Sequence, residues 1–389
     1  MLKVGLENFL EQELESTLGE RVGYLSNHAC TNRSFIYGKD LIAEKLGKRL
    51  SCLFSPQHGF FAEKQDNMVE SDHVVDSKTG LPMFSLYGEH RKPTKEMFDH
   101  LDTLLIDLVD IGTRVYTFMY TMAYCLEAAA EFGKKIIVLD RPNPIGGEQI
   151  EGNILKDDYR SFVGRYNIPM RHGLTLGELA LFFNEEYAIG AELEVVKVTG
   201  WSREQYLDDT DFPWVIPSPN MPTVEAAIHY PGQVIWEGTL VSEGRGTTMP
   251  FCFFGAPYWN HDEIMDFLLR YKIAGAVLRP VVFEPMFGKW VGKACTGFQL
   301  HVEDKRIFNS YRTALILMQA AILVYPEKFE YKQPPYEYEF DKMPIDLILG
   351  DKTLRQQIEA GVSIDTLEQQ WLPELQDYDM RRKKYFLYK

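Results

Sequence analysis

Residues 103–144 read TLLIDLVDIGTRVYTFMYTMAYCLEAAAEFGKKIIVLDRPNP, and this stretch decides the fold. Two short apolar runs, 103–106 and 135–139, each end at an aspartate. The segment between them, 116–133, is rich in alanine and methionine, which favour helix. Continuous apolar runs joined by a helix predict two parallel strands that are buried on both faces.

The same alternation continues on both sides of this unit. Helices are expected over 39–50 and after Thr175, because Thr175 and Glu178 form a capping box that satisfies backbone groups at a helix start. Further strands are expected over 21–27, 50–54 and 192–198. The sequence therefore predicts an α/β fold, with a parallel sheet covered by helices on both faces.

The composition of the chain changes after about residue 208. Prolines at 213, 217, 219, 222 and 231 break any long helix. Beyond them we expect strands over 281–283 and 297–302 and helices over 261–271, 310–325 and 352–360. A chain of 389 residues is long for a single core, so two packed units are favoured over one long domain. We expect an α/β domain over 1–210 and a smaller α+β domain over 211–389.

Composition narrows the class of partner. The formal net charge is −15, which repels phosphate backbones and argues against nucleic acid. The five cysteines are widely separated and lack paired metal spacing, so we interpret them as buried hydrophobes. The first fifteen residues hold no apolar run long enough for a signal peptide or a membrane span. We expect a cytoplasmic protein without a membrane partner, although a secreted protein with its leader removed has the same pattern.

Polar side chains follow each expected strand of the first half. Because the carboxyl ends of parallel strands lie at one edge of a sheet, these side chains are expected to surround a ligand. Taken singly, each is equally well explained as a solvated loop start or a helix cap. The loops contribute Asn27 and His28; Gln57 and His58; Asp107, Asp110 and Arg114; and Asp140, Arg141 and Asn143.

Other segments combine charge with a stiff backbone. Residues 110–116 hold an acid, a base and a phenol, or else an aspartate cap with an internal salt bridge. Two prolines stiffen 140–144, which either grips a substrate carboxylate or hydroxyl or is a purely structural turn. Residues 217–222 form a rigid extended loop, and 237–247 are rich in glycine and charge, which allows a close backbone approach to a ligand.

Several common site motifs are absent from the sequence. No Gly-x-Gly-x-x-Gly follows the first strand, and residues 242–247 lack the terminal Gly-Lys-Ser/Thr of a phosphate loop. There is no His-Glu-x-x-His, paired cysteine motif or Gly-x-Ser-x-Gly. We predict neither cofactor nor metal, with a metal held by His58, Asp107 and Asp110 as the less favoured alternative.

Over nearly its whole length the chain resembles the NamZ-type exo-β-N-acetylmuramidases, formerly a YbbC-like family of unknown function. The resemblance rests on Ser85-Leu86-Tyr87-Gly88 with Arg91-Lys92-Pro93-Thr94, Asp110-Ile111-Gly112-Thr113-Arg114 with Tyr116, Asp140-Arg141-Pro142-Asn143-Pro144 with Gly146-Gly147, Ser161-Phe162-Val163-Gly164, Arg171-His172-Gly173 with Thr175, Pro217 to Thr223, and Ser242-Glu243-Gly244-Arg245-Gly246-Thr247. It implies a Rossmann-like domain joined to a smaller C-terminal domain, with the active site in the cleft between them. The implied reaction releases terminal β-linked N-acetylmuramic acid from the non-reducing ends of peptidoglycan fragments.

The implied substrate suggests which side chains bind it. Muramic acid carries a lactyl carboxylate, so an exo enzyme selecting it needs a fixed cation. The candidates, which spacing does not rank, are Arg91, Arg114, Arg141, Arg171 and Arg245. Other expected substrate contacts are Asn27, Glu63, Tyr87, Tyr116, Asp140, Asn143, His172, Ser218, Asn220, Glu237 and Ser242.

One departure from the family pattern concerns catalysis. The family usually reads Glu-His-Gly after the second strand, with that glutamate as the implied acid, whereas this chain reads Gln57-His58-Gly59. Glutamine does not transfer a proton, and glycoside hydrolysis normally needs two carboxyl groups. We expect Gln57, His58, Asp110 and Glu243 at the catalytic centre, with Glu63 as a further replacement acid. The alternatives are a glycosidase of cell-wall recycling and a muropeptide-binding homologue that has lost hydrolysis.

Overall fold

The computed structural model describes residues 1–12, 18–64 and 68–389. Its larger sheet has the strand order β3-β4-β2-β1-β5-β6-β7, and every neighbouring pair is parallel except β3 with β4. The strands are β1 (Val22–Leu25), β2 (Leu50–Ser55), β3 (Val74–Val75), β4 (Pro82–Ser85), β5 (Thr103–Ile106), β6 (Lys135–Leu139) and β7 (Glu192–Val196). The expected parallel α/β fold is confirmed.

Helices cover both faces of this sheet. On one face, Phe9 and Ile42 pack with Tyr24 and Leu105 of the strands in one apolar core. On the other face, helical residues such as Leu126 pack with other strand residues in a second core. The helices of this half are α1 (Gly5–Glu11), α2 (Gly38–Leu46), α3 (Lys95–Phe98), α4 (Phe118–Phe132) and α5 (Leu176–Glu186). Contacts with the sheet come from α1 and α2 on the first face and from α4 and α5 on the second.

Local chemistry explains where two of these helices begin and end. The expected helix over 39–50 stops at Leu46, because Gly47 has a φ of 54°, outside the helical region. A short 3-10 turn then leads directly into β2. The capping box that starts α5 is confirmed: Thr175 Oγ1 accepts from Glu178 N at 3.2 Å, and Glu178 Oε2 accepts from Thr175 N at 3.0 Å.

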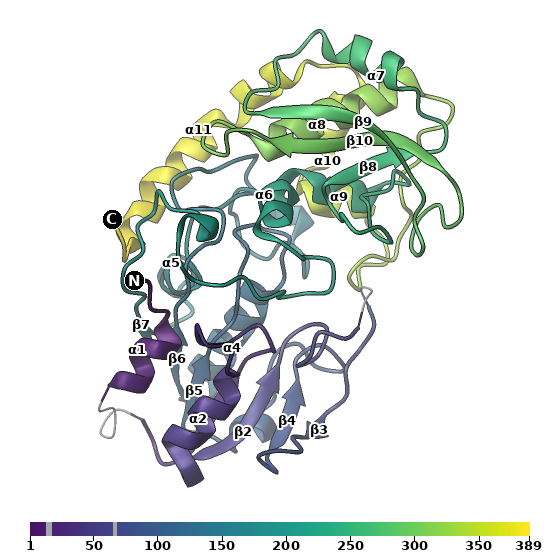
Figure 1. Ribbon diagram of the computed structural model, residues 1–389. Helices are drawn as coiled ribbons and strands as arrows, with labels where there is room; N and C mark the ends of the chain where they lie inside the picture. The colour runs from purple at the N-terminus through teal and green to yellow at the C-terminus, as the bar shows by residue number, and fades with distance from the viewer. Residues whose placement is uncertain (13–17, 65–67) are drawn as a thin grey trace.

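The second half builds the smaller sheet, whose antiparallel strands follow the order β8-β10-β9 (Figure 1). Its elements are α6 (Val224–Gln233), β8 (Phe253–Ala256), α7 (His261–Leu268), β9 (Ala276–Phe283), β10 (Cys295–Val302) and α8 (Ser310–Val324). Strand β9 begins five residues earlier than expected and contains Pro280, which an edge strand tolerates. Pro231 lies inside α6, which ends two residues later.

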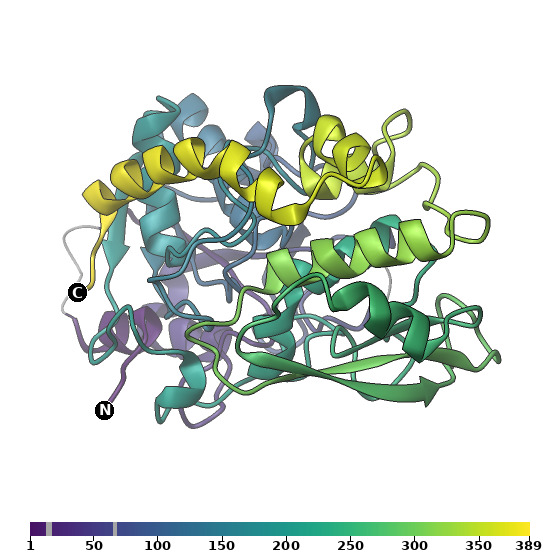
Figure 2. The same ribbon diagram turned by 90° about the horizontal axis from the view of Figure 1, so that it is seen from above.

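The C-terminal segment returns to the first sheet (Figures 1 and 2). Tyr388 donates from its hydroxyl to Asp140 Oδ2 at 2.6 Å, and Arg382 donates to the carbonyls of Gly147 and Gly173. The remaining helices are α9 (Pro344–Leu349), α10 (Lys352–Glu359) and α11 (Ile364–Arg382), and 3-10 turns span Gly47–Arg49, Asp157–Tyr159, Leu207–Asp209, Val234–Gly238 and Lys383–Tyr385. The tail therefore ties the two halves together, and a boundary at residue 210 stays a prediction.

Candidate active site

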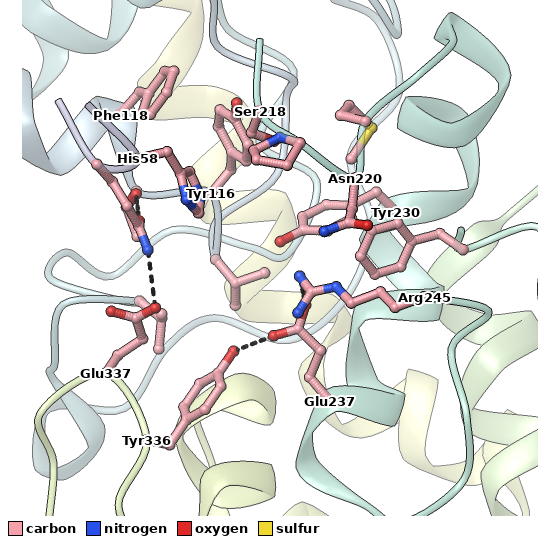
Figure 3. Close-up of a pocket in the computed structure, with 17 residues that line it drawn as sticks. His58, Tyr116, Phe118, Ser218, Asn220, Tyr230, Glu237, Arg245, Tyr336 and Glu337 are labelled. Atoms are coloured by element: carbon pink, nitrogen blue, oxygen red, sulfur yellow. Dashed lines mark hydrogen bonds and ion pairs between the residues drawn. The ribbon is translucent and has the colours of Figure 1, made fainter. Parts of the chain in front are cut away.

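A pocket lies where loops of the parallel-sheet half meet segments of the second half (Figure 3). The space between its lining residues, open mouth included, is about 530 Å³. Its lining comes from residues 57–58, 115–118, 218–221 and 336–337, with Val163, Tyr230, Glu237, Arg245 and Phe251. The pocket thus combines segments that are up to 280 residues apart along the chain.

Gln57 and His58 enter the pocket from the turn after β2. His58 and Gly59 both have positive φ, 71° and 77°, so the chain reverses sharply here. Gln57 accepts from the Thr117 hydroxyl at the start of α4, and its Nε2 donates to Glu337 Oε1 at 3.1 Å. The amide is therefore held at both ends, and its nitrogen is directed at a carboxyl group.

Glu337 is the carboxyl group that Gln57 contacts. It has a φ of 46°, a conformation that non-glycine residues rarely adopt and that tends to occur at functional sites. The Tyr87 hydroxyl donates to its other oxygen, Oε2, at 2.8 Å. Burial raises the pKa of Glu337 to about 6, although the hydrogen bonds from Tyr87 and Gln57 oppose the shift. This side chain can carry a proton near neutral pH.

Glu237 is a second buried carboxyl group in the pocket, with different surroundings. Its Oε1 accepts from Arg245 Nη2 at 2.8 Å, and its Oε2 accepts from the Tyr336 hydroxyl at 2.8 Å (Figure 3). The arginine makes this an ion pair, whereas Glu337 receives only neutral donors in its hydrogen bonds. Two carboxyl groups in unlike environments are the arrangement that lets one give a proton while the other stays charged.

Glu243 stands behind Arg245 and does not line the pocket. Its Oε2 accepts from Lys289 Nζ at 2.6 Å, and its Oε1 lies 3.8 Å from Arg245 Nε. Burial opposes ionisation, yet Lys289 and Arg245 together hold the pKa of Glu243 below its usual value. A carboxylate kept charged in this way is suited to fixing Arg245 rather than to donating a proton.

The structure brings some of the predicted site residues together. The Tyr87 hydroxyl donates a hydrogen bond to Glu337 of the pocket lining. Arg91 lies in a second cleft, which Glu337 also lines. Of the residues expected at the catalytic centre, Gln57 and His58 line the pocket, whereas Asp110 and Glu243 do not. The predicted residues in the lining are Gln57, His58, Tyr116, Ser218, Asn220, Glu237 and Arg245.

Three of the candidate arginines lie instead in what we call the arginine frame, formed by Arg114, Arg141 and Arg171. Arg114 is fully buried and donates to four backbone carbonyls, those of Asn153, Ile168, Ile348 and Leu349. Arg141 forms an ion pair with Asp107, and Arg171 forms one with Glu151. Their donors are directed at protein groups, so the frame holds segments of the chain together.

The other predicted residues also lie outside the pocket. Asp140 caps α5, accepting from Gly177 N at 2.7 Å and Thr175 Oγ1 at 2.7 Å, and burial raises its pKa to about 6. Asp110 accepts from the ring of His172 at 3.2 Å. Asn27 donates to Pro217, Asn143 donates to Leu174, Ser242 pairs through its backbone with Gly255, and Glu63 is exposed.

Sequence reasoning missed Glu337 and Tyr336. They follow no strand and belong to none of the motifs weighed above, so nothing places them at the edge of the sheet. The available signal is the pair Pro334-Pro335 followed by alternating tyrosine and glutamate over 336–339, a stiff segment that presents acidic side chains. Thr117 and Tyr230 of the lining were also missed, because each lies beside or within an apolar helix.

Within residues 1–12, 18–64 and 68–389, no group of three or more His, Cys, Asp or Glu side chains is placed to hold a metal ion. The less favoured metal site at His58, Asp107 and Asp110 is not assembled there: Asp107 pairs with Arg141, and His58 Nδ1 donates to the Lys64 carbonyl at 2.8 Å. In that same part of the chain, no helix has the length and apolar character needed to cross a bilayer.

The pocket brings two buried carboxyl groups of the second half, Glu237 and Glu337, to the loops of an α/β sheet, and paired carboxyl groups are typical of glycosidases. The chain belongs to the NamZ exo-β-N-acetylmuramidase family: the N-terminal family model matches residues 22–225 and the C-terminal one matches 228–388. It is 42% identical over 387 residues to the peptidoglycan β-N-acetylmuramidase NamZ of Bacillus subtilis, covering 100% of this chain and 91% of that protein. The predicted family is confirmed.

Two solved structures have the same fold. Both are DUF1343 family proteins from Bacteroides fragilis, and each comparison covers 100% of this chain and 99% of the other. One has a TM-score of 0.89 at 34% sequence identity, and the other has a TM-score of 0.77 at 28% identity. The parallel sheet and the smaller antiparallel sheet are therefore shared with experimentally determined relatives.

Proposed function

We propose that this protein is an exo-acting glycosidase that releases terminal β-linked N-acetylmuramic acid from peptidoglycan fragments in cell-wall recycling. The observation that carries the proposal is the pair of buried carboxyl groups, Glu237 and Glu337, in the lining of one pocket. Hydrolysis of a glycosidic bond needs two such groups and a water molecule, with no cofactor. The family membership supplies the sugar, because the relative from Bacillus subtilis is a peptidoglycan β-N-acetylmuramidase.

Arg245 is the arginine best placed to bind the lactyl carboxylate of the substrate. It alone of the five candidates lines the pocket, while Arg91 lies in the adjoining cleft. Its Nη2 donates to Glu237, and its Nε lies 3.8 Å from Oε1 of Glu243, which is not part of the pocket lining. A guanidinium group has five N–H donors, so Arg245 can bind a second carboxylate while keeping Glu237. Ser218 and Asn220 offer a hydroxyl and an amide to the sugar hydroxyls.

Gln57 favours a second candidate function, a muropeptide-binding protein without hydrolysis. This residue occupies the position where the family resemblance implies a catalytic glutamate, and an amide cannot donate the proton that the leaving oxygen needs. The pocket and Arg245 would then serve binding alone.

The two candidates differ in turnover of a 4-nitrophenyl β-N-acetylmuramide. If the protein is a glycosidase, the wild type should release nitrophenol from this substrate. A Gln57→Glu variant is assayed beside it under the same conditions. Turnover by the variant alone would support the binding candidate. If neither protein turns over the substrate and calorimetry detects no binding of N-acetylmuramic acid, both proposals are refuted.

A small muropeptide or sugar is the expected partner, because the chain belongs to a family with a peptidoglycan-cleaving relative. The cytoplasmic location expected from the sequence stays a prediction, and fractionation of cells that express the natural gene is the measurement that tests it.

A further inference from the structure

Glu337 lies between two hollows of the protein surface. One is the pocket described above, and the other is a cleft of about 770 Å³, open space included, which Arg91, Phe162, Arg165 and Tyr338 help to line. Glu337 is the residue common to both linings. A residue in both linings can contact a sugar in the pocket and also a group attached to that sugar in the cleft.

The cleft has the chemistry of a site for a sugar that carries anionic groups. The Arg91 guanidinium carbon stacks 3.8 Å from the centre of the Tyr338 ring and 5.0 Å from that of Phe162. Aromatic rings pack well against sugar rings, and an arginine fixed between them can bind a carboxylate of an attached peptide. Within the described residues, no acidic side chain lies within ion-pair distance of Arg91.

We propose that Glu337 is the proton donor of the reaction, and that the adjoining cleft holds the leaving group. This inference rests on the proposed glycosidase function. In a glycosidase, the acid must lie beside the oxygen that joins the cleaved sugar to the leaving group. The junction between the pocket and the cleft is that place.

The step balances with water as the only other reactant. The Glu337 carboxyl gives its proton to the glycosidic oxygen as the bond from that oxygen to the sugar C1 breaks, and the bonding electrons stay on the oxygen. The leaving group departs as an alcohol. Water then bonds through its oxygen to C1 and loses a proton, which returns to Glu337 directly or through Glu237 and solvent. The sum is the addition of one water molecule across the bond.

The proposal also gives Gln57 a role as a positioning residue. Its Nε2 donates a hydrogen bond to Glu337 Oε1. The carboxyl group that position 57 lacks is therefore present on Glu337, the residue that accepts this hydrogen bond. Thr117 donates to the oxygen of the same amide, whose nitrogen therefore faces Glu337. The acid therefore comes from the second half of the chain, not from the loop after β2.

The groups that face Glu337 support a working proton donor. Burial raises its pKa to about 6, and nearby Glu237 acts in the same direction, while Tyr87, Gln57 and Arg91 lower it. A general acid is most effective when its pKa lies near the working pH. The protonated form predominates below about pH 6, so activity should fall as the pH rises above that value.

Comparison of two leaving groups tests the proposal. Nitrophenol leaves without help from an acid, whereas a sugar alcohol requires protonation. We expect Glu337→Gln to lower kcat/KM by about 10²–10⁴-fold for a disaccharide with terminal β-N-acetylmuramic acid. The loss for the 4-nitrophenyl glycoside should be at least tenfold smaller, and the fall in activity at high pH should disappear. An equal loss for both substrates, or no loss for either, would overturn the assignment.

The ratio of the two activities within one sample does not depend on how much of the variant is folded, so a destabilised Glu337→Gln protein still gives an answer. Glu327→Gln is the matched control, because it makes the same change at an exposed carboxylate of the same half of the chain. The control should leave both activities unchanged. A wild-type protein that cleaves neither substrate refutes the proposed function, whereas an active wild type with an unaffected Glu337→Gln refutes this inference alone.

Discussion

The arginine frame and the pocket both bury charged side chains, but they use them in opposite ways. In the frame, Arg114 donates to four backbone carbonyls, and Arg141 and Arg171 each pair with a carboxylate. In the pocket, Glu337 has a positive φ and receives neutral donors, and Arg245 lines the open space while it pairs with Glu237.

This difference separates residues that hold the fold from residues suited to a ligand. Saturated buried charges are costly to disturb but have little capacity left for a substrate. Groups that border open space and have shifted pKa values or positive φ keep that capacity, and such features cluster at functional sites. Mutations in the frame should therefore affect stability first, and mutations in the pocket should affect activity first.

The largest effect is expected in the frame. Arg114→Met leaves four buried carbonyls without their donor, two of them at the end of α9. We expect the free energy of unfolding to fall by about 3–5 kcal/mol, measured by urea denaturation. Arg306→Met, at an exposed arginine near Asp209, is the control and should cost less than about 1 kcal/mol. A small effect of Arg114→Met would remove the distinction between frame and pocket.

A smaller effect, on activity, is expected from Glu237→Gln. The change keeps the shape of the side chain but removes the second carboxylate of the pocket. We expect kcat/KM to fall at least about 100-fold, equivalent to about 2.7 kcal/mol, for both the disaccharide and the nitrophenyl glycoside. Glu225→Gln, at an exposed position of α6, is the matched control for kinetics. Unchanged turnover by Glu237→Gln would exclude this residue from the chemistry.

The smallest effect is expected from Tyr87→Phe. The Tyr87 hydroxyl donates to Glu337 and lowers its pKa, so its loss should raise that pKa further above the ordinary glutamate value. The fall in kcat/KM at high pH should then move to higher pH, while the maximal rate changes by less than about tenfold, or 1.4 kcal/mol. The pH profile of Tyr37→Phe, which removes a hydroxyl at the N-terminus of α2, should match the wild type. A shift to lower pH would contradict the assigned interaction.

Much of the fold follows from the sequence, because buried parallel strands have a simple pattern. The bounds expected for β5 and β6 agree with the structure, and α7, α8 and α10 begin at the expected residues. Helix α11 was not predicted. It contains Pro373 and many charged residues, and few of its residues are buried, so its apolar pattern is weak. Strand β3 has two exposed residues and no pattern to detect.

The site was predictable only in part. The rule that polar residues follow strands selected Gln57 and His58, which line the pocket, but it also selected Asp140, Arg141 and Asn143, which are held in the buried structure. A single sequence does not show whether a charged residue after a strand is saturated by distant carbonyls, as Arg114 is. The place of Glu337 in the site depends on its contacts with Gln57 and Tyr87. These contacts are long-range, so local sequence patterns do not reveal them.

The most direct test of the pocket as the sugar site is a crystal structure of the protein soaked with N-acetylmuramic acid. The account predicts the sugar ring between Glu237 and Glu337, with the lactyl carboxylate on Arg245 and the arginine frame unchanged. Sugar bound instead at the ends of β5 and β6, against Asp140 and Arg141, would contradict it, as would an empty pocket at a sugar concentration that saturates binding in solution.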